Sequence, residues 1–176
     1  MQLLVIVLIG VLVLLTFVTI GVAVLAATIF SGAPWVPTDK VVSRGMCDLA
    51  DLKEGDRVLD LGCGDGSILL IAAKEYRAVG HGVELNFLLV WMARLRAKMM
   101  GVSDKVTFER GNMFHVDLPD TDIAMLYLLP KATHRVEKRL RERYKHLKVI
   151  SHGFKLEQGP VDEKRVARAT VRKYEW

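Results

Sequence analysis

The sequence predicts an α/β fold in which a parallel sheet is covered by helices and follows one long apolar helix. From Arg57 onward, short apolar segments typical of strands alternate with longer segments of helical period. This alternation favours a parallel sheet with helices on both faces. Residues 1–38 carry no charged side chain, whereas the 25 Lys and Arg and the 20 Asp and Glu residues all follow. The chain of 176 residues has room for one domain of ordinary size.

The expected elements after the apolar segment begin with a helix at Asp39. Strands are expected at 57–61, 78–84, 106–110, 122–128, 148–153 and 166–176, and further helices at 66–74, 86–100, 131–147. Predicted strands and helices therefore follow one another in turn over most of the domain.

The apolar segment Leu3–Phe30 is predicted to cross a membrane. As a helix it would be about 42 Å long, and a bilayer core is about 30 Å thick. A cleaved signal peptide is the alternative, since Ser31-Gly32-Ala33 is an acceptable cleavage site. The segment lacks a basic start, however, and is longer than a signal peptide requires. We therefore expect the bilayer as a partner through residues 3–30.

These features divide the chain into an anchor at 1–30, a linker at 31–38 and a folded domain at 39–176. Lys40 and Arg44 follow the anchor, and the positive-inside rule then places the domain on the cytoplasmic side. Only Cys47 and Cys63 are present, without a CxxC or Cys/His cluster. Neither a disulfide framework nor a metal site is expected, which fits a reducing compartment.

A glycine-rich loop follows the first strand, within Val58–Ser67 (VLDLGCGDGS). Dinucleotide folds favour G-x-G-x-x-G for a pyrophosphate, but here the spacing is G-x-G-x-G and Ser67 stands at the third position. Acids oppose a pyrophosphate and suit the ammonium and sulfonium of S-adenosylmethionine (SAM). The small side chain of Cys63 is interpreted as structural. The predicted cofactor-binding residues here are Asp60, Gly62, Cys63, Gly64, Asp65, Gly66.

Two further segments fit a nucleoside cofactor. Glu84, with Leu85 and Asn86, ends the second strand, where an acid can accept hydrogen bonds from both ribose hydroxyls of SAM or NAD. Asn112 and Met113 follow the third strand, where they could contact the amine and the ring of an adenine. An ordinary asparagine turn is the alternative for this last segment.

The methyl acceptor is expected beside Tyr127-Leu128-Leu129-Pro130, after the fourth strand. Methyltransferases that act on amino groups of DNA bases carry an Asp/Asn-Pro-Pro-aromatic motif at this place. This sequence lacks the motif, which argues against adenine or cytosine amino groups as acceptors. Tyr127 and Pro130 are the candidate catalytic residues, although Tyr127 could equally be a core tyrosine. The five histidines fall on different elements, show no ligand spacing and are expected to be surface or satisfied residues.

The segment 131–148 carries eight basic residues against Glu137 and Glu142. A solvated helix face explains them, and contact with anionic lipid is the alternative. Aromatic residues are sparse among these charges, so no nucleic-acid partner is expected.

Taken in order, the motifs resemble those of the membrane-associated protein-lysine methyltransferases whose mitochondrial members modify the adenine nucleotide translocase and the ATP synthase c subunit. The shared segments are Pro34–Thr38, the glycine loop, Glu84–Asn86, Tyr127–Pro130 and Val149–Phe154. The resemblance implies a Rossmann-like class I methyltransferase sheet, SAM as cofactor and a lysine of a membrane protein as acceptor.

Two departures from the family pattern concern the substrate. Phe87 stands where the family has proline, and KLEQGP follows Phe154 where the family is rich in proline. The identity of the acceptor therefore cannot be carried over. A lipid or quinone-type methyltransferase and a non-catalytic SAM-binding scaffold stay open as alternatives.

Overall fold

The computed structural model describes residues 2–30 and 36–176. The chain separates into two compact units, Met1–Trp35 and Val36–Trp176, and each is described by itself. Most of the predicted linker at 31–38 lies outside the described residues.

The first unit contains the single helix α1 (Gln2–Phe30), as the apolar segment predicts. Its span Val5–Val22 is long and apolar enough to cross a membrane. The hydroxyl of Thr16 donates to the carbonyls of Leu12 and Val13 at 3.1 and 2.7 Å. Thr19 bonds in the same way to the preceding turn. These polar groups are thus satisfied within the helix, as an apolar environment requires.

The second unit alternates strands and helices, as predicted. Its elements are α2 (Lys40–Leu49), β1 (Arg57–Leu61), α3 (Ser67–Tyr76), β2 (Val79–Glu84), α4 (Phe87–Met100), β3 (Val106–Arg110), β4 (Ile123–Leu126), α5 (Pro130–Arg143), β5 (Lys148–His152), β6 (Asp162–Val166) and β7 (Ala169–Glu175).

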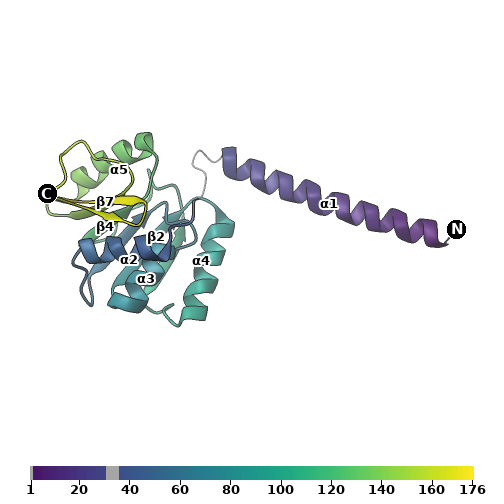
Figure 1. Cartoon of the computed structure of the whole chain (residues 1–176), viewed down its shortest axis with the longest axis horizontal. Helices are drawn as coiled ribbons and strands as arrows, with labels where there is room; N and C mark the ends of the chain where they lie inside the picture. The colour runs from purple at the N-terminus through teal and green to yellow at the C-terminus, as the bar shows by residue number, and fades with distance from the viewer. Residues whose placement is uncertain (1, 31–35) are drawn as a thin grey trace. The chain divides into compact units, whose positions relative to one another are not determined.

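The strands form one sheet in the order β3-β2-β1-β4-β5-β7-β6. Figure 1 labels β2, β4 and β7 of this sheet. The prediction of a parallel sheet is correct for β1 to β5 and wrong for the last two strands, which pair antiparallel. The single strand predicted at 166–176 is the second half of a hairpin. The sequence of β6, DEKRV, has four exposed residues and lacks apolar alternation, so only its pairing with β7 defines it as a strand.

Helix α5 ends at Arg143, four residues before its predicted end. Tyr144 is extended, its ring is buried, and its hydroxyl donates to the carbonyl of Pro119. The apolar residues Tyr144 and Leu147 therefore continue the spacing of the helix because they pack in the segment that leads into β5. Periodicity alone does not separate this from another helical turn.

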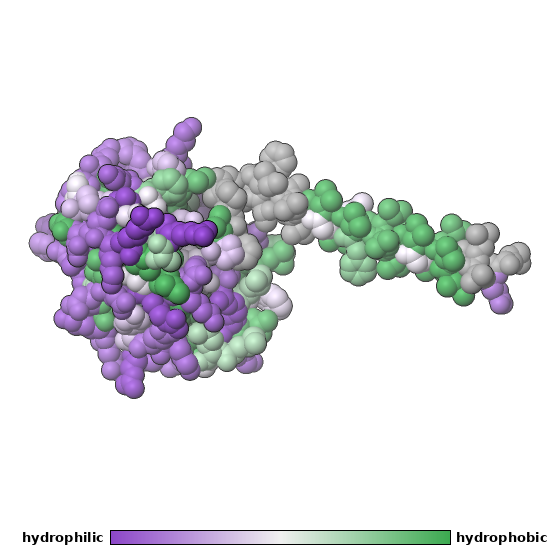
Figure 2. Space-filling model, viewed as in Figure 1, coloured by the Kyte–Doolittle hydropathy of each residue, from purple (hydrophilic) through white to green (hydrophobic). Residues whose placement is uncertain are grey.

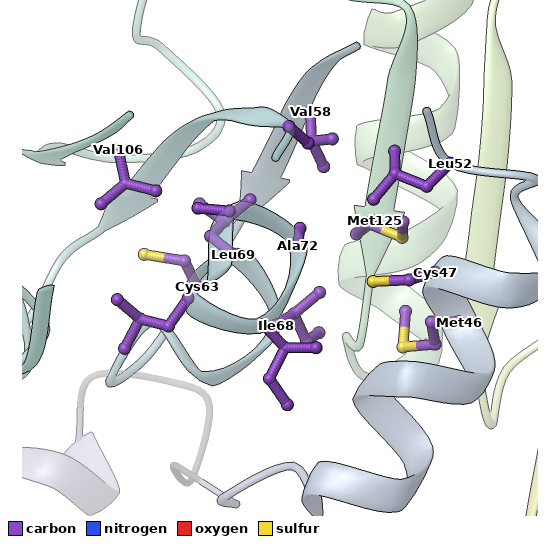
Figure 3. Close-up of a cluster of buried hydrophobic side chains, with 14 of the residues drawn as sticks. Met46, Cys47, Leu52, Val58, Cys63, Ile68, Leu69, Ala72, Val106 and Met125 are labelled. Atoms are coloured by element: carbon purple, nitrogen blue, oxygen red, sulfur yellow. The ribbon is translucent and has the colours of Figure 1, made fainter. Parts of the chain in front are cut away.

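Helices α2, α3 and α4 cover one face of the sheet, and α5 covers the other. Successive residues of a strand point to opposite faces of the sheet. Val58 and Met125 pack on the side of α2, α3 and α4, and Leu59 and Leu126 pack on the side of α5. Figure 3 shows Met46 and other side chains of α2 and α3 around Val58 and Met125. Because both faces are filled, the carboxyl ends of the parallel strands are left to form a site.

Candidate cofactor and acceptor site

The glycine loop between β1 and α3 has a left-handed backbone at each of its glycines. The φ angles are 85° at Gly62, 56° at Gly64 and 76° at Gly66. Side chains rarely adopt this conformation, so the loop needs glycine at these positions. The G-x-G-x-G spacing is thus explained by the backbone path of the loop.

Close packing adds a second constraint on the loop. A Cβ on Gly66 would lie 2.6 Å from the Phe108 ring, and one on Gly62 would lie 2.9 Å from Leu128 Cδ2. Cys63 is buried, with its Sγ 2.7 Å from the position of a Cβ on Gly82. Burial raises the pKa of the Cys63 thiol well above its ordinary value. A neutral, packed thiol fits the structural interpretation of Cys63.

Glu84 joins the glycine loop to the end of β2. Its Oε2 accepts a hydrogen bond from the Gly64 backbone N–H at 3.1 Å, and its Oε1 accepts one from Asn86 N–H at 2.8 Å. The Asn86 side chain in turn accepts from Leu88 N–H and caps α4. Each carboxylate oxygen retains acceptor capacity, so Glu84 can also receive ribose hydroxyls. The adjacent Leu85 is exposed.

The two acids of the glycine loop have different surroundings. Asp60 is only 2% exposed, and its Oδ2 has no hydrogen-bond partner among the described residues. Burial, and then the charges of Glu84 and Asp65, raise the pKa of Asp60 to about 8. Asp65 instead pairs with Arg96 and accepts from the Ser67 hydroxyl at 2.7 Å. Of these two acids, Asp60 is therefore the one without a cationic partner in the described chain, and a cation that binds beside it would favour its ionised form.

The segment predicted to hold adenine lies beside the glycine loop. Met113 Sδ is 3.7 Å from the position of a Cβ on Gly62. The Asn112 side chain accepts from Phe114 N–H at 3.0 Å and so stabilises a local turn. Arg139 of α5 donates to the carbonyls of Met113 and Val116. Arg139 is thus bonded to the backbone of this segment, whereas the sequence predicts it on a solvated helix face.

The acceptor side lies at the ends of β4 and β5. The rings of Tyr127 and His152 stack with centroids 3.9 Å apart and an angle of 27° between their planes. Burial lowers the pKa of His152, and its Nδ1 is buried without a partner among the described residues. Leu126 pairs with Ser151 in the sheet, which brings the next residue of each strand together. Pro130 is exposed and begins α5, a position that proline favours.

His152 is not among the predicted site residues, although its place near the end of the predicted strand 148–153 makes it a possible neighbour of the site. Its only signal is its position at the end of β5, which becomes informative once β5 is known to lie beside β4. The expectation that all histidines are surface or satisfied residues does not describe His152, because its Nδ1 is buried and unpaired in the described chain.

The residues at the carboxyl edge of β1 and β2 fit an adenosyl amino acid. Glycine backbone permits close approach, Glu84 can accept hydroxyls, Asp60 can face an ammonium or sulfonium, and Met113 offers an apolar surface. The sheet order and this edge together define a class I SAM-dependent methyltransferase.

Comparison with known proteins identifies the family. Residues 60–163 match the model of the ANTKMT methyltransferase domain, and the chain belongs to this family of SAM-dependent protein-lysine methyltransferases. A protein-lysine N-methyltransferase of Saccharolobus islandicus (strain REY15A) is 34% identical over 125 residues, which cover 70% of this chain and 78% of that protein.

Two further comparisons agree on the enzyme class. The lysine N-methyltransferase of the ATP synthase c subunit from Homo sapiens is 32% identical over 69% of this chain, which spans about half (52%) of that relative. The structure of an RNA methyltransferase from Salinibacter ruber with S-adenosyl-L-homocysteine is 37% identical, with a TM-score of 0.77 and coverage of 80% of this chain and 93% of that one. The cofactor is therefore SAM.

Proposed function

We propose that this protein is a membrane-anchored methyltransferase that transfers the SAM methyl group to a lysine of a membrane protein. One observation carries the proposal: the same chain joins a lysine methyltransferase domain to the apolar helix α1. Lys40 and Arg44 follow α1, so by the positive-inside rule the domain faces the cytoplasm. Tethering raises the effective concentration of substrates in the same membrane.

The proposed division of labour follows the sheet. Bound SAM supplies an electrophilic methyl group at the carboxyl edge. The glycine loop, Glu84 and Asp60 hold and orient this cofactor, with Asn112 and Met113 beside the adenine. Tyr127 lines the acceptor side. A lysine must be neutral to act as a nucleophile, and apolar neighbours such as Leu129 favour the neutral amine. Positioning and exclusion of water then account for most of the catalysis.

The human relative supports a membrane-protein substrate, since it is a lysine methyltransferase of the ATP synthase c subunit. An RNA substrate is a second candidate, because the Salinibacter ruber structure is of an RNA methyltransferase. The Tyr127–Pro130 segment lacks the Asp/Asn-Pro-Pro-aromatic motif of amino methyltransferases that act on bases. We therefore favour lysine.

The test is methylation of a membrane fraction. The full chain in detergent is incubated with methyl-labelled SAM and membranes, and separately with total RNA. We expect the label in protein, and acid hydrolysis should release it as methyl-lysine. Label only in lipid or only in RNA would contradict the lysine proposal.

If no label is transferred although SAM still binds, the result would favour a non-catalytic scaffold. Removal of α1 tests the anchor separately: a soluble peptide that carries the modified lysine should be methylated as before, while membrane methylation falls. Equal methylation of membranes with and without α1 would contradict anchoring as the source of substrate choice.

A further inference from the structure

Helix α4 exposes a stripe of large apolar side chains. Phe87, Trp91, Leu95 and Met99 are 58%, 61%, 43% and 78% exposed. They recur every four residues and so lie along one side of the helix. Leu85, just before α4, and Met92 widen this stripe. We call these six residues the α4 apolar surface, and Figure 2 shows apolar side chains on the α4 side of the domain.

The α4 apolar surface is not the core-facing side of the helix. Leu89, Val90, Ala93 and Ala97 supply that side, and all four are buried. A helix that packs on one face of a sheet is normally polar on its outer side, whereas α4 is apolar on both. A contiguous exposed apolar surface marks an interaction site.

The charged residues of α4 are all basic. Helix α4 contains Arg94, Arg96 and Lys98 and no acidic residue. Arg96 forms an ion pair with Asp65, whereas Lys98 is exposed. The guanidinium of Arg110 lies 5.9 Å from the centre of the Phe87 ring. Aromatic, aliphatic and basic side chains on one helix side are typical of helices that lie in the membrane interface.

We propose that the α4 apolar surface docks onto the bilayer, with its basic neighbours against anionic headgroups. This inference rests on the proposed anchoring through α1. Residues 31–39 join α1 to α2, and even a fully extended connection of this length reaches only about 30 Å. A bilayer that holds α1 is therefore always available to the domain, unlike a partner that must diffuse to it.

A second copy of the chain is a poorer occupant. A two-fold contact places the same surface on both protomers. The basic residues of α4 would then face each other without an acid of the same helix to pair with. Anionic lipid compensates these charges instead.

The docked orientation has a consequence for the reaction. Helix α4 begins three residues after Glu84 and is capped by Asn86, so its first turn lies at the cofactor edge of the sheet. Contact of Phe87 with the bilayer brings this edge to the headgroup region. The enzyme is then suited to lysines close to the membrane surface.

Nitroxide labelling of the full chain tests this proposal. The chain is reconstituted in phosphatidylcholine vesicles containing phosphatidylglycerol, with a label at Trp91→Cys or Met99→Cys. The matched control is Lys138→Cys, an exposed position of α5. Native Cys47 and Cys63 are buried and should label poorly. We expect labels at 91 and 99 to be more accessible to oxygen than to an aqueous nickel chelate, and the label at 138 to show the reverse.

The outcomes separate the two proposals. If the chain floats with the vesicles but labels at 91 and 99 are as accessible to nickel as the label at 138, α4 docking is wrong and anchoring stands. Dipolar broadening at 91 with low accessibility to both reagents would indicate a second copy and also overturn docking. If the chain does not float with the vesicles, both proposals are wrong. Vesicles without phosphatidylglycerol should shift the label at 91 toward the aqueous reagent.

Discussion

The cofactor half and the acceptor half of the site are built in different ways. At the β1–β2 edge, Glu84 accepts hydrogen bonds from the backbone of Gly64 and Asn86, and left-handed glycines shape the loop. At the β4–β5 edge, Tyr127 stacks on His152, and the side chains of Thr133 and Arg172 donate to the carbonyls of Leu128 and Gly153. Three left-handed glycines within one loop shape the cofactor half, whereas the acceptor half has one such glycine, Gly153, and depends more on side chains that meet from separate strands. The second kind of contact can change with the substrate while the fold stays the same.

Each half also contains one buried polar atom that lacks a partner in the described chain, Asp60 Oδ2 and His152 Nδ1. Burial disfavours the charged form of both groups, since it raises the pKa of Asp60 and lowers the pKa of His152. The difference lies in what each can receive: a cation beside Asp60 would favour its ionised form, whereas the Nδ1 of neutral His152 can donate or accept a hydrogen bond, depending on the tautomer.

Gly66→Ala should have the largest effect, because it alters the backbone of the cofactor half. Alanine would have to adopt the left-handed φ of 76° that Gly66 has. Its Cβ would also lie 2.6 Å from the Phe108 ring. Strain and overpacking together should lower the free energy of unfolding by about 2–5 kcal/mol. Gly101→Ala is the control, since its φ is 68° but no atom lies within 4 Å of the Cβ. Denaturant titrations should show a clearly smaller loss for Gly101→Ala, and equal losses would mean that close packing at Gly66 is unimportant.

The pH dependence of stability should reveal the buried carboxyl of Asp60. Its pKa is raised to about 8 in the folded protein, against about 3.9 in an unfolded chain. Between about pH 3.9 and pH 8 the folded state therefore binds more protons at Asp60 than the unfolded state does. The contribution of Asp60 to the free energy of unfolding is then highest at low pH and falls as pH rises, by up to about 1.4 kcal/mol per pH unit. Asp60→Asn should remove this contribution.

Chemical denaturation of both proteins at pH 5, 6 and 7 measures this difference. Subtracting the two curves cancels the opposite contribution of His152, whose lowered pKa makes stability rise with pH. Parallel curves for wild type and Asp60→Asn would contradict a protonated Asp60.

Glu84→Ala should weaken SAM binding by about 1–3 kcal/mol, because the cofactor hydroxyls and two backbone groups lose a charged acceptor. Calorimetric titration with SAM measures the change. Glu109→Ala, on the neighbouring strand β3 and half exposed, is the matched control and should bind SAM as wild type does. Unchanged affinity in Glu84→Ala would place the cofactor elsewhere.

The smallest effect is expected in the acceptor half. A double-mutant cycle of Tyr127→Leu and His152→Leu should give a coupling free energy of about 0.5–1.5 kcal/mol for the stacked pair. Thermal denaturation of the four proteins supplies the values. SAM affinity should stay constant across the cycle, and a loss comparable to that of Glu84→Ala would erase the distinction between the two halves.

Motifs within a few residues of one another made the local structure of the β1–β2 edge predictable. The glycine spacing, the acid after the second strand and the following asparagine all depend on local backbone conformation, which the sequence specifies directly. The same locality explains why α1 and most strand and helix boundaries agree with expectation. Interactions between distant segments were missed: the pairing of Asp65 with Arg96, the clamp of Arg139 on Met113, and the edge strand β6.

The sequence by itself determined the class of cofactor, the family and the apolar helix, because each depends on residue types at short, characteristic spacings. Only the tertiary structure decided which acid of the loop stays unpaired, that His152 meets Tyr127, and that the outer side of α4 is apolar and uncovered. Burial and strand order depend on contacts between residues far apart in the chain. A spacing pattern carries no information about such contacts until the sheet brings those residues together.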